Sequence, residues 1–156
     1  MEVLIVTPFF PYEPGRPYAG IFVGDQVLSL RQLGTRPRVV TFVPWTPWPT
    51  PIARERWRVF SRIPRQYSWK DIAVEARRYP VLPHNMGLGI ASWAMERVLF
   101  QHCVRSQPDL IHAHFAYPTG LAAVRAGARH GVPVVLTVHG SDIHKLPSLS
   151  RRCKKG

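Results

Sequence analysis

Continuous apolar runs constrain the fold of this chain more than any other feature. They occur at residues 3–7, 38–43, 110–115 and 132–139. A strand with one face in water alternates apolar and polar residues, whereas a strand buried on both faces of a parallel sheet is apolar nearly throughout. The run at residues 3–7 therefore predicts a strand buried on both faces of a parallel sheet that helices cover, and the other runs predict further strands of that sheet.

Segments with the periodicity of amphipathic helices separate these runs, at residues 21–33, 89–105 and 119–130. This alternation predicts an α/β fold with a doubly wound, Rossmann-like parallel sheet. In the second helix we expect the sheet to be faced by Ile90, Trp93, Ala94, Val98 and Leu99. In the third helix we expect it to be faced by Leu121, Val124 and Ala128.

Residues 45–79 differ from the rest of the chain because their periodicity is weak. We expect an irregular connection there, with a short strand near residues 74–79. Residues 148–156 are short and basic and have no apolar period. The sequence thus predicts one domain over residues 1–147, followed by a basic tail.

Length and cysteine content narrow the class of protein. A chain of 156 residues fits one domain, and its 46% apolar content is normal for a packed core. No apolar run reaches the roughly 18 residues of a membrane-spanning helix. Cys103 and Cys153 are far apart and lack metal-ligand spacing, which argues against a disulfide framework and a zinc site and fits the cytosol.

The formal net charge of +12 indicates attraction to an anionic partner. Nucleic acid, an anionic membrane surface and phosphorylated small molecules would all satisfy it, and so would a well-solvated surface rich in arginine. Nucleic acid is the weakest of these partners, because the basic residues follow no recognised nucleic-acid-binding motif.

Ligands of open parallel sheets bind beyond the carboxyl ends of the strands. At the first such end, Gly20 directly precedes a helix whose free N–H groups suit a phosphate. The same glycine also fits a simple turn. The chain contains neither G-x-G-x-x-G nor G-x-x-x-x-G-K-[ST], which argues against a nicotinamide-binding domain and a P-loop nucleotidase.

Histidines mark two further strand ends. His112 and His114 are two residues apart on a strand, so their side chains point to the same face; each also fits a core histidine, and a metal site would need a further ligand. His139, Gly140, Ser141 and Asp142 follow the last strand, where they are placed for contact with a polar ligand, and Asp142 also fits a helix cap. The absence of a G-x-S-x-G elbow argues against a hydrolase.

The order of these motifs resembles the N-terminal domain of family-4 glycosyltransferases, enzymes with the GT-B fold of two Rossmann-like domains. The resemblance covers residues 1–147 and is carried by residues 3–11, Gly20-Ile21-Phe22-Val23 with Gln26, residues 108–114 and residues 137–142. It implies that Gly20 lies near the donor phosphates and the acceptor, and that His139 contacts the donor sugar as the catalytic residue. His114, Gly140, Ser141 and Asp142 would contribute to donor or acceptor binding.

The resemblance also implies a reaction. A sugar would pass, with retention, from a nucleotide-sugar donor to a glycan or lipid-linked acceptor. No metal or other cofactor is expected, because basic side chains and helix dipoles would stabilise the leaving diphosphate. The sequence departs from the family at Ala19, where many relatives have a glycine, so the backbone of this loop is less free to approach a diphosphate.

A larger departure is that no E-x7-E motif follows Asp142, so the second GT-B domain is absent from this sequence. We therefore expect a fragment, a truncated reading frame or a split half that is inactive alone and needs its C-terminal domain or a separate partner chain. The alternative is a stand-alone, non-catalytic module that binds an acceptor or a partner.

The segment 45–79 combines tryptophans with arginines such as Arg54, Arg56 and Arg58. Many relatives build envelope polysaccharides or glycolipids at the inner membrane surface, so we expect a cytoplasmic protein with peripheral membrane contact. Arginine attracts anionic headgroups and tryptophan suits the interface, and the hypothesis assigns this segment to the membrane or to a lipid-linked acceptor. The alternative is an ordinary loop whose tryptophans pack in the core.

Overall fold

The computed structural model describes residues 1–13, 19–45, 55–81, 88–140 and 142. Its elements, in chain order, are β1 (Glu2–Thr7), α1 (Ile21–Gln32), β2 (Arg36–Trp45), α3 (Glu55–Arg62), β3 (Gln66–Trp69), β4 (Ile72–Pro80), α4 (Leu88–Ser106), β5 (Leu110–His114), the π-helical turn η2 (Ala116–Gly120), α5 (Leu121–His130) and β6 (Val134–Thr137). Within the described part of the chain, no helix has the length and apolarity needed to cross a membrane.

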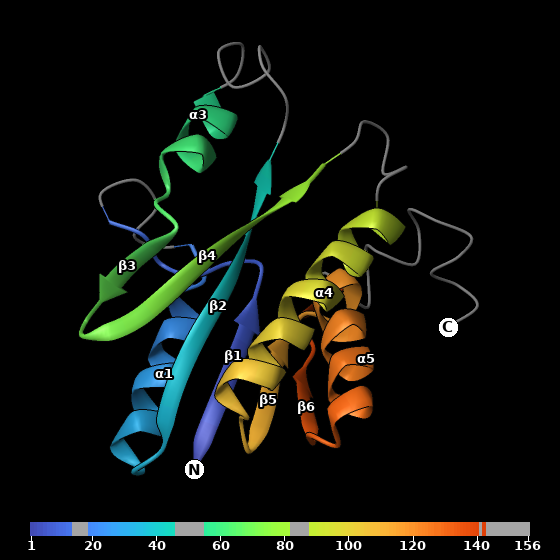
Figure 1. Ribbon diagram of the computed structural model, residues 1–156. Helices are drawn as coiled ribbons and strands as arrows, with labels where there is room; N and C mark the ends of the chain where they lie inside the picture. Colours follow the sequence, from blue (N-terminus) through green and yellow to red (C-terminus); the bar gives the residue numbers. More distant parts are fainter. Residues whose placement is uncertain (14–18, 46–54, 82–87, 141, 143–156) are drawn as a thin grey trace.

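The strands form one six-stranded sheet in the order β3-β4-β2-β1-β5-β6 (Figure 1). All neighbouring pairs are parallel except β3 and β4, which form an antiparallel hairpin at one edge. The prediction of a parallel, Rossmann-like α/β sheet is therefore confirmed, with an antiparallel edge strand that it did not include.

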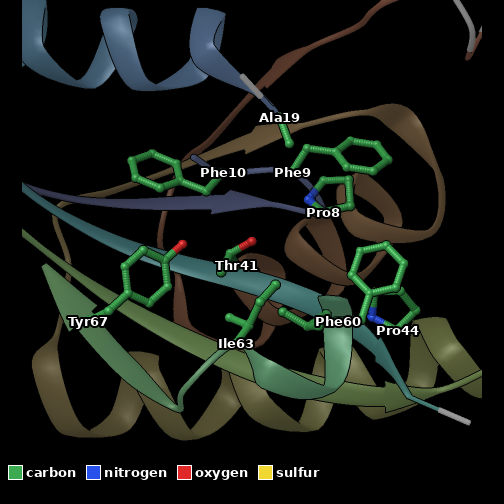
Figure 2. Close-up of a pocket in the computed structure, with 10 residues that line it drawn as sticks. Pro8, Phe9, Phe10, Ala19, Thr41, Pro44, Phe60, Ile63 and Tyr67 are labelled. Carbon is green, nitrogen blue, oxygen red and sulfur yellow. The ribbon is translucent and has the colours of Figure 1, made fainter. Parts of the chain in front are cut away.

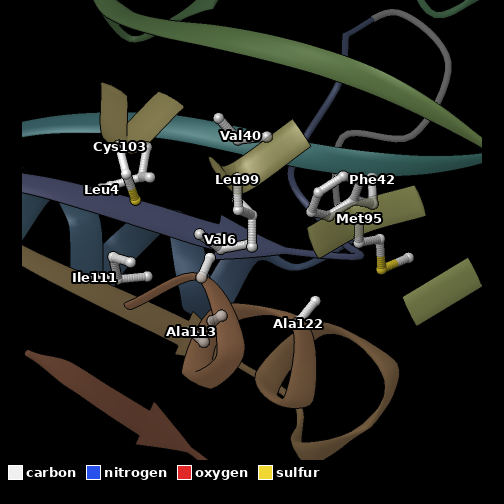
Figure 3. Packing of buried hydrophobic residues seen from close by; sticks show 12 residues of the cluster. Leu4, Val6, Val40, Phe42, Met95, Leu99, Cys103, Ile111, Ala113 and Ala122 are labelled. Carbon is white, nitrogen blue, oxygen red and sulfur yellow. The ribbon is translucent and has the colours of Figure 1, made fainter. Parts of the chain in front are cut away.

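Helices cover both faces of the sheet, as a doubly wound fold requires. Val3 and Ile5 of β1 pack in the cluster that contains residues of α1, whereas Leu4 and Val6 pack in the cluster that contains residues of α4 and α5 (Figure 3). Successive side chains of a strand point to opposite faces, so the apolar run of β1 supplies both cores. This strand is the centre of the domain.

The expectation for residues 45–79 is confirmed for its short strand near residues 74–79, which belongs to β4, and wrong for the irregular connection in the rest of the described part. The structure has α3 and the β3–β4 hairpin there. The helix has eight residues, too few for a clear period. The hairpin turns at Lys70 and Asp71, whose φ angles of 47° and 62° belong to the type I′ turns that usually contain Asn-Gly or Asp-Gly, so the sequence lacked the usual turn signal.

The expected inward face of α4 is also wrong in part. Ile90 and Trp93 are 49% and 55% exposed. The buried line of the helix instead runs along Ala91, Met95, Leu99 and Cys103, and Figure 3 shows the last three of these side chains. These positions recur every four residues, and they include small side chains that a search for large apolar residues passes over.

The predicted buried face of helix α5 is likewise wrong in part. Val124 and Ala128 are exposed, whereas Ala122, Ala123, Ala126 and Gly127 are buried. A Cβ at Gly127 would lie 2.5 Å from a methyl carbon of Val134 and 2.7 Å from the carbonyl oxygen of Val132. The helix therefore lies so close to the backbone near β6 that only small residues fit between them.

The corrected face of α4 predicts unequal effects of two truncations. Leu99→Ala removes a fully buried side chain and should lower the free energy of unfolding by about 2–5 kcal/mol. Val104→Ala, on the exposed face of the same helix, should change it by less than about 0.5 kcal/mol. Urea denaturation followed by circular dichroism measures both values, and equal losses would contradict the assignment of the buried face.

Candidate functional site

The carboxyl ends of β1, β5 and β6 lie side by side, because β5 pairs with both neighbours in the sheet. Their adjacency brings Gly20 at the start of α1, the histidine at the end of β5 and residues 138–140 after β6 to one edge. The structure therefore groups His114, His139, Gly140 and Asp142 as the sequence predicts. Ser141 lies outside the described residues.

Gly20 is the residue before α1, and its conformation requires glycine. Its φ is +73°, and a Cβ there would lie 2.3 Å from the carbonyl oxygen of Phe9. No side chain caps the helix, and its first turn contains no acidic residue. The N-terminus of α1 therefore keeps backbone N–H groups and a partial positive charge directed to this edge.

His139 lies in an aromatic wall that the sequence analysis missed. Its half-buried ring is 4.7 Å from the ring centre of Phe22 and 4.3 Å from that of Phe115. Phe9 packs edge-on against Phe115 at 5.3 Å. Phe9 and Phe115 follow strand ends, and Phe22 lies close after Gly20. Their positions in the sequence, next to the residues of the expected site, could have indicated that their rings line it.

The backbone at Phe115 is held in an unusual conformation. Its φ is +70°, a region that a bulky residue rarely adopts and that costs of order 1–3 kcal/mol. The Phe115 N–H donates to the carbonyl of Thr137, and the Phe115 carbonyl accepts from the N–H of Gly120. These bonds hold the conformation that turns the Phe115 ring toward His139.

Asp142 connects the ends of β5 and β6. One carboxylate oxygen, Oδ2, accepts the backbone N–H of Ala116 at 3.0 Å and that of His139 at 3.1 Å. The Asp142 N–H in turn donates to the carbonyl of His139, and the residue is only 8% exposed. The carboxylate thus fixes His139 relative to the turn that follows β5, and its contact with a ligand stays a prediction.

His112 and His114 stack on the same face of β5, with ring centres 4.5 Å apart. Nε2 of His112 lies 2.8 Å from the hydroxyl of Thr137, and Nδ1 of His114 lies 3.4 Å from Nε2 of His139. His114 has no exposed surface and stacks behind His139, and its part in donor or acceptor binding stays a prediction.

Burial keeps the rings behind His139 uncharged. Loss of solvation, and then the charges of His112 and His139, lower the pKa of His114 to about 4. Burial also lowers the pKa of His112. At neutral pH both rings are therefore neutral, and each offers one donor and one acceptor nitrogen. Among the described residues, no group of three or more His, Cys, Asp or Glu side chains is arranged to hold a metal ion.

Comparison with known families decides what kind of domain carries this site. Residues 19–155 match the family described as Glycosyl transferase 4-like domain. The chain belongs to this family. The resemblance to family-4 glycosyltransferases that the motifs indicated is thus confirmed.

One relative is TuaC of Bacillus subtilis (strain 168), a glycosyltransferase assigned to teichuronic acid biosynthesis. The two sequences are 31% identical over 158 residues, which covers 97% of this chain and 39% of TuaC. The domain therefore spans about two fifths of the length of this relative.

Solved structures support the fold. The UDP-GlcNAc 2-epimerase of Methanocaldococcus jannaschii gives a TM-score of 0.53 at 13% identity, covering 93% of this chain and 34% of that one. The UDP-GlcNAc 2-epimerase of Neisseria meningitidis, solved with UDP-GlcNAc bound, gives 0.51 at 16% identity, covering 98% and 38%. At such identities the likeness shows the shared Rossmann-like fold alone.

A cavity lies beside the aromatic wall of the domain, at the ends of β1 and β2 and against α3 (Figure 2). Its lining is mostly apolar, and Thr41 and Tyr67 supply hydroxyl groups. Burial and the neighbouring Tyr12 raise the pKa of Tyr67, so the phenol stays protonated. The volume is about 20 Å³, enough for roughly one water molecule, so no sugar ring fits there without movement.

A larger hollow of about 490 Å³ lies between α4 and the outer strands, away from the strand ends. Among the groups that line it, the Glu75 carboxylate lies 3.4 Å from Nε2 of His102, and Glu75 also contacts Arg77. Burial lowers the pKa of His102 more than Glu75 raises it. None of Gly20, His114, His139 and Asp142 lines this hollow, so it is separate from the site at the strand ends.

The geometry at Gly20 predicts a difference between two glycine substitutions. Gly34 also has a positive φ, of 80°, but a Cβ there would meet nothing within 4 Å. Gly34→Ala should thus cost only the conformational penalty of about 1 kcal/mol. Gly20→Ala should cost more, because its Cβ collides with the backbone of Phe9. Thermal and urea denaturation of the two variants measure the costs, and equal values would contradict the close approach.

The lowered pKa of His114 predicts a pH-dependent stability. The unfolded residue, with a pKa of 6.5, binds protons more readily than the folded one, with a pKa of about 4. The stability linked to His114 is therefore complete above pH 6.5 and is lost as the pH falls toward 4, by at most about 3 kcal/mol.

Urea denaturation between pH 7 and pH 4.5 tests this expectation against His114→Gln, whose side chain does not titrate. The variant should lose less stability than the unaltered chain over this interval. Parallel curves for the two proteins would show that His114 titrates normally in the folded state.

Proposed function

We propose that this domain is the acceptor-side half of a retaining glycosyltransferase that moves a sugar from a nucleotide-sugar donor to a glycan or lipid-linked acceptor. One observation carries the proposal: in a chain of this family, the uncapped N-terminus of α1 meets the half-exposed His139 at the ends of three adjacent strands. A sugar that carries phosphate needs positive charge for the phosphate and a flat aromatic surface for the sugar ring, and both must lie at the same place.

The parts of this edge suggest roles for its residues. The N–H groups at the start of α1 would face the donor diphosphate and stabilise the charge that develops as it leaves. His139 would contact the donor sugar, held by Asp142 from the backbone and by His114 from behind. Phe22 and Phe115 would keep water from the reacting carbon and pack against the apolar face of a sugar ring.

Glycosyl transfer by this chain would require a second domain. The chain spans 39% of TuaC, and in our proposal the remaining nucleotide contacts come from such a domain, joined to this one or supplied as a separate chain. The domain would then be inactive alone. The transfer would need no metal ion, because the helix dipole and basic side chains would offset the diphosphate charge.

The compartment follows from the substrate. Nucleotide sugars are cytoplasmic metabolites, so we place the protein in the cytoplasm, with a lipid-linked acceptor at the inner membrane face. This placement also agrees with the buried thiol of Cys103, which needs no oxidising environment.

Ligand titration of the isolated chain tests the location of the site. When UDP- and GDP-sugars or candidate acceptor glycans are added to isotope-labelled protein, amide NMR shifts should concentrate at Gly20, Phe22, Phe115 and His139. His139→Ala should weaken binding, whereas His130→Ala, on the last residue of α5, should not. Saturable shifts confined to another face would move the site.

Turnover can be measured by fusing this chain to the part of TuaC that it does not match. The isolated chain should be inactive and the fusion active with the donor of TuaC. His139→Ala in the fusion should lower kcat by about 100-fold if its contact strengthens at the transition state. Full turnover by the His139→Ala fusion would remove this residue from the catalytic role, and turnover by the isolated chain would contradict the need for a second domain.

A further inference from the structure

Helix α4 carries an exposed apolar line along its outer face. Ile90, Trp93, Phe100 and Val104 are each between 40% and 55% exposed. With Arg97 they are spaced by three, four, three and four residues, so they follow one another along one side of the helix. At 1.5 Å per residue the line is roughly 20 Å long. The opposite side of α4 is already buried against the domain, so this exposed apolar face is available to contact a second surface.

The charges around this line are all of one sign. Glu96 is the single acidic residue in the described helices α4 and α5; it is 4% exposed and pairs with Arg125 and Arg129 of α5. Arg97 stacks its guanidinium on the ring of Trp93, 5.0 Å from the ring centre, and Arg105 is also exposed. The helical layer thus presents apolar and cationic groups together, without an exposed carboxylate on either helix.

The charge pattern selects the occupant of this face. A second copy of the chain would bring two molecules of net charge +12 together and would place Arg97 near its own symmetry mate, with no acidic group on either helix to offset the repulsion. An anionic lipid surface fits both the apolar line and the arginines beside it, since its headgroups attract arginines and its interface accepts tryptophan and phenylalanine. We propose that the outer face of α4 docks on an anionic membrane surface.

This surface differs from the segment 45–79 that the sequence indicated. Within the described part of that segment, Trp69 is 5% exposed and packs edge-on against Phe10, and Trp57 is half-buried against Phe60. These two tryptophans are thus used for internal packing, whereas Trp45, the first residue of the segment, is 45% exposed at the end of β2. Trp93, by contrast, is the most exposed tryptophan of the described residues.

The location of the face fits an enzyme that works on membrane-bound acceptors. Helix α4 follows β4 in the chain and runs back along the sheet, so its first turns lie toward the carboxyl ends of the strands (Figure 1). Ile90 and Trp93 lie in those first turns. Docking would hold the edge that carries His139 beside the lipid surface; this consequence rests on the proposed function, but the docking itself does not.

Vesicle flotation with the full chain tests the proposal. The chain should float with vesicles of about 30% phosphatidylglycerol in phosphatidylcholine and remain unbound with phosphatidylcholine alone. The double variant Trp93→Ser/Phe100→Ser should bind at least about tenfold more weakly, as should Arg97→Glu/Arg105→Glu, because each arginine near such a surface contributes about 1 kcal/mol. Circular dichroism checks that these surface variants are folded.

Matched controls make the result specific to α4. Leu33→Ser removes an apolar side chain that is 79% exposed beyond the end of α1 and should leave flotation unchanged. Arg58→Glu/Arg62→Glu reverses two charges on α3 and should lower binding far less than reversal on α4. The proposal is overturned if the α3 pair has the larger effect, if the α4 variants float like the unaltered chain, or if light scattering shows a dimer that the α4 variants dissociate.

Discussion

The parallel pairing of β5 between β1 and β6 is the constraint on which the rest of the site depends. Each of these strands ends at the same edge of the sheet, and each is followed by a segment that contributes to the site. Register decides the detail, because His112 is paired with Val135 and His114 with Thr137. A shift by one residue would turn the histidines into the opposite core, so the apolar residues that fix the register also fix the chemistry.

The sequence was sufficient to predict the central strands and the site edge. Val3 to Thr7 is apolar nearly throughout because both faces of β1 are buried, and a domain of this size has few places for such a run except the middle of its sheet. Gly20 was also accessible to prediction, since a glycine directly before a helix has few roles. His139 could be located because the topology of parallel sheets places every strand end on one edge.

Other features depended on contacts that no local pattern records. Alanines and Gly127 form the buried face of α5 because the helix lies close to β6, and the separation of two elements is a property of the whole fold. The aromatic wall arises from Phe9, Phe22 and Phe115, which are distant in sequence. The backward reach of Asp142 was likewise not predictable: its carboxylate accepts the N–H groups of Ala116 and His139, at the point where helical residues Gly140 and Asp142 begin.

This backward bond has a consequence for motion within the domain. A single oxygen atom restrains both the turn after β5 and the segment that holds His139, so neither can be displaced without straining a charge-assisted hydrogen bond to the other. A ligand that shifts His139 would change the free energy of opening the η2 turn, and a contact made by that turn would change ligand affinity by the same factor, since such coupling is reciprocal. One carboxylate oxygen therefore couples the position of the turn after β5 to that of His139.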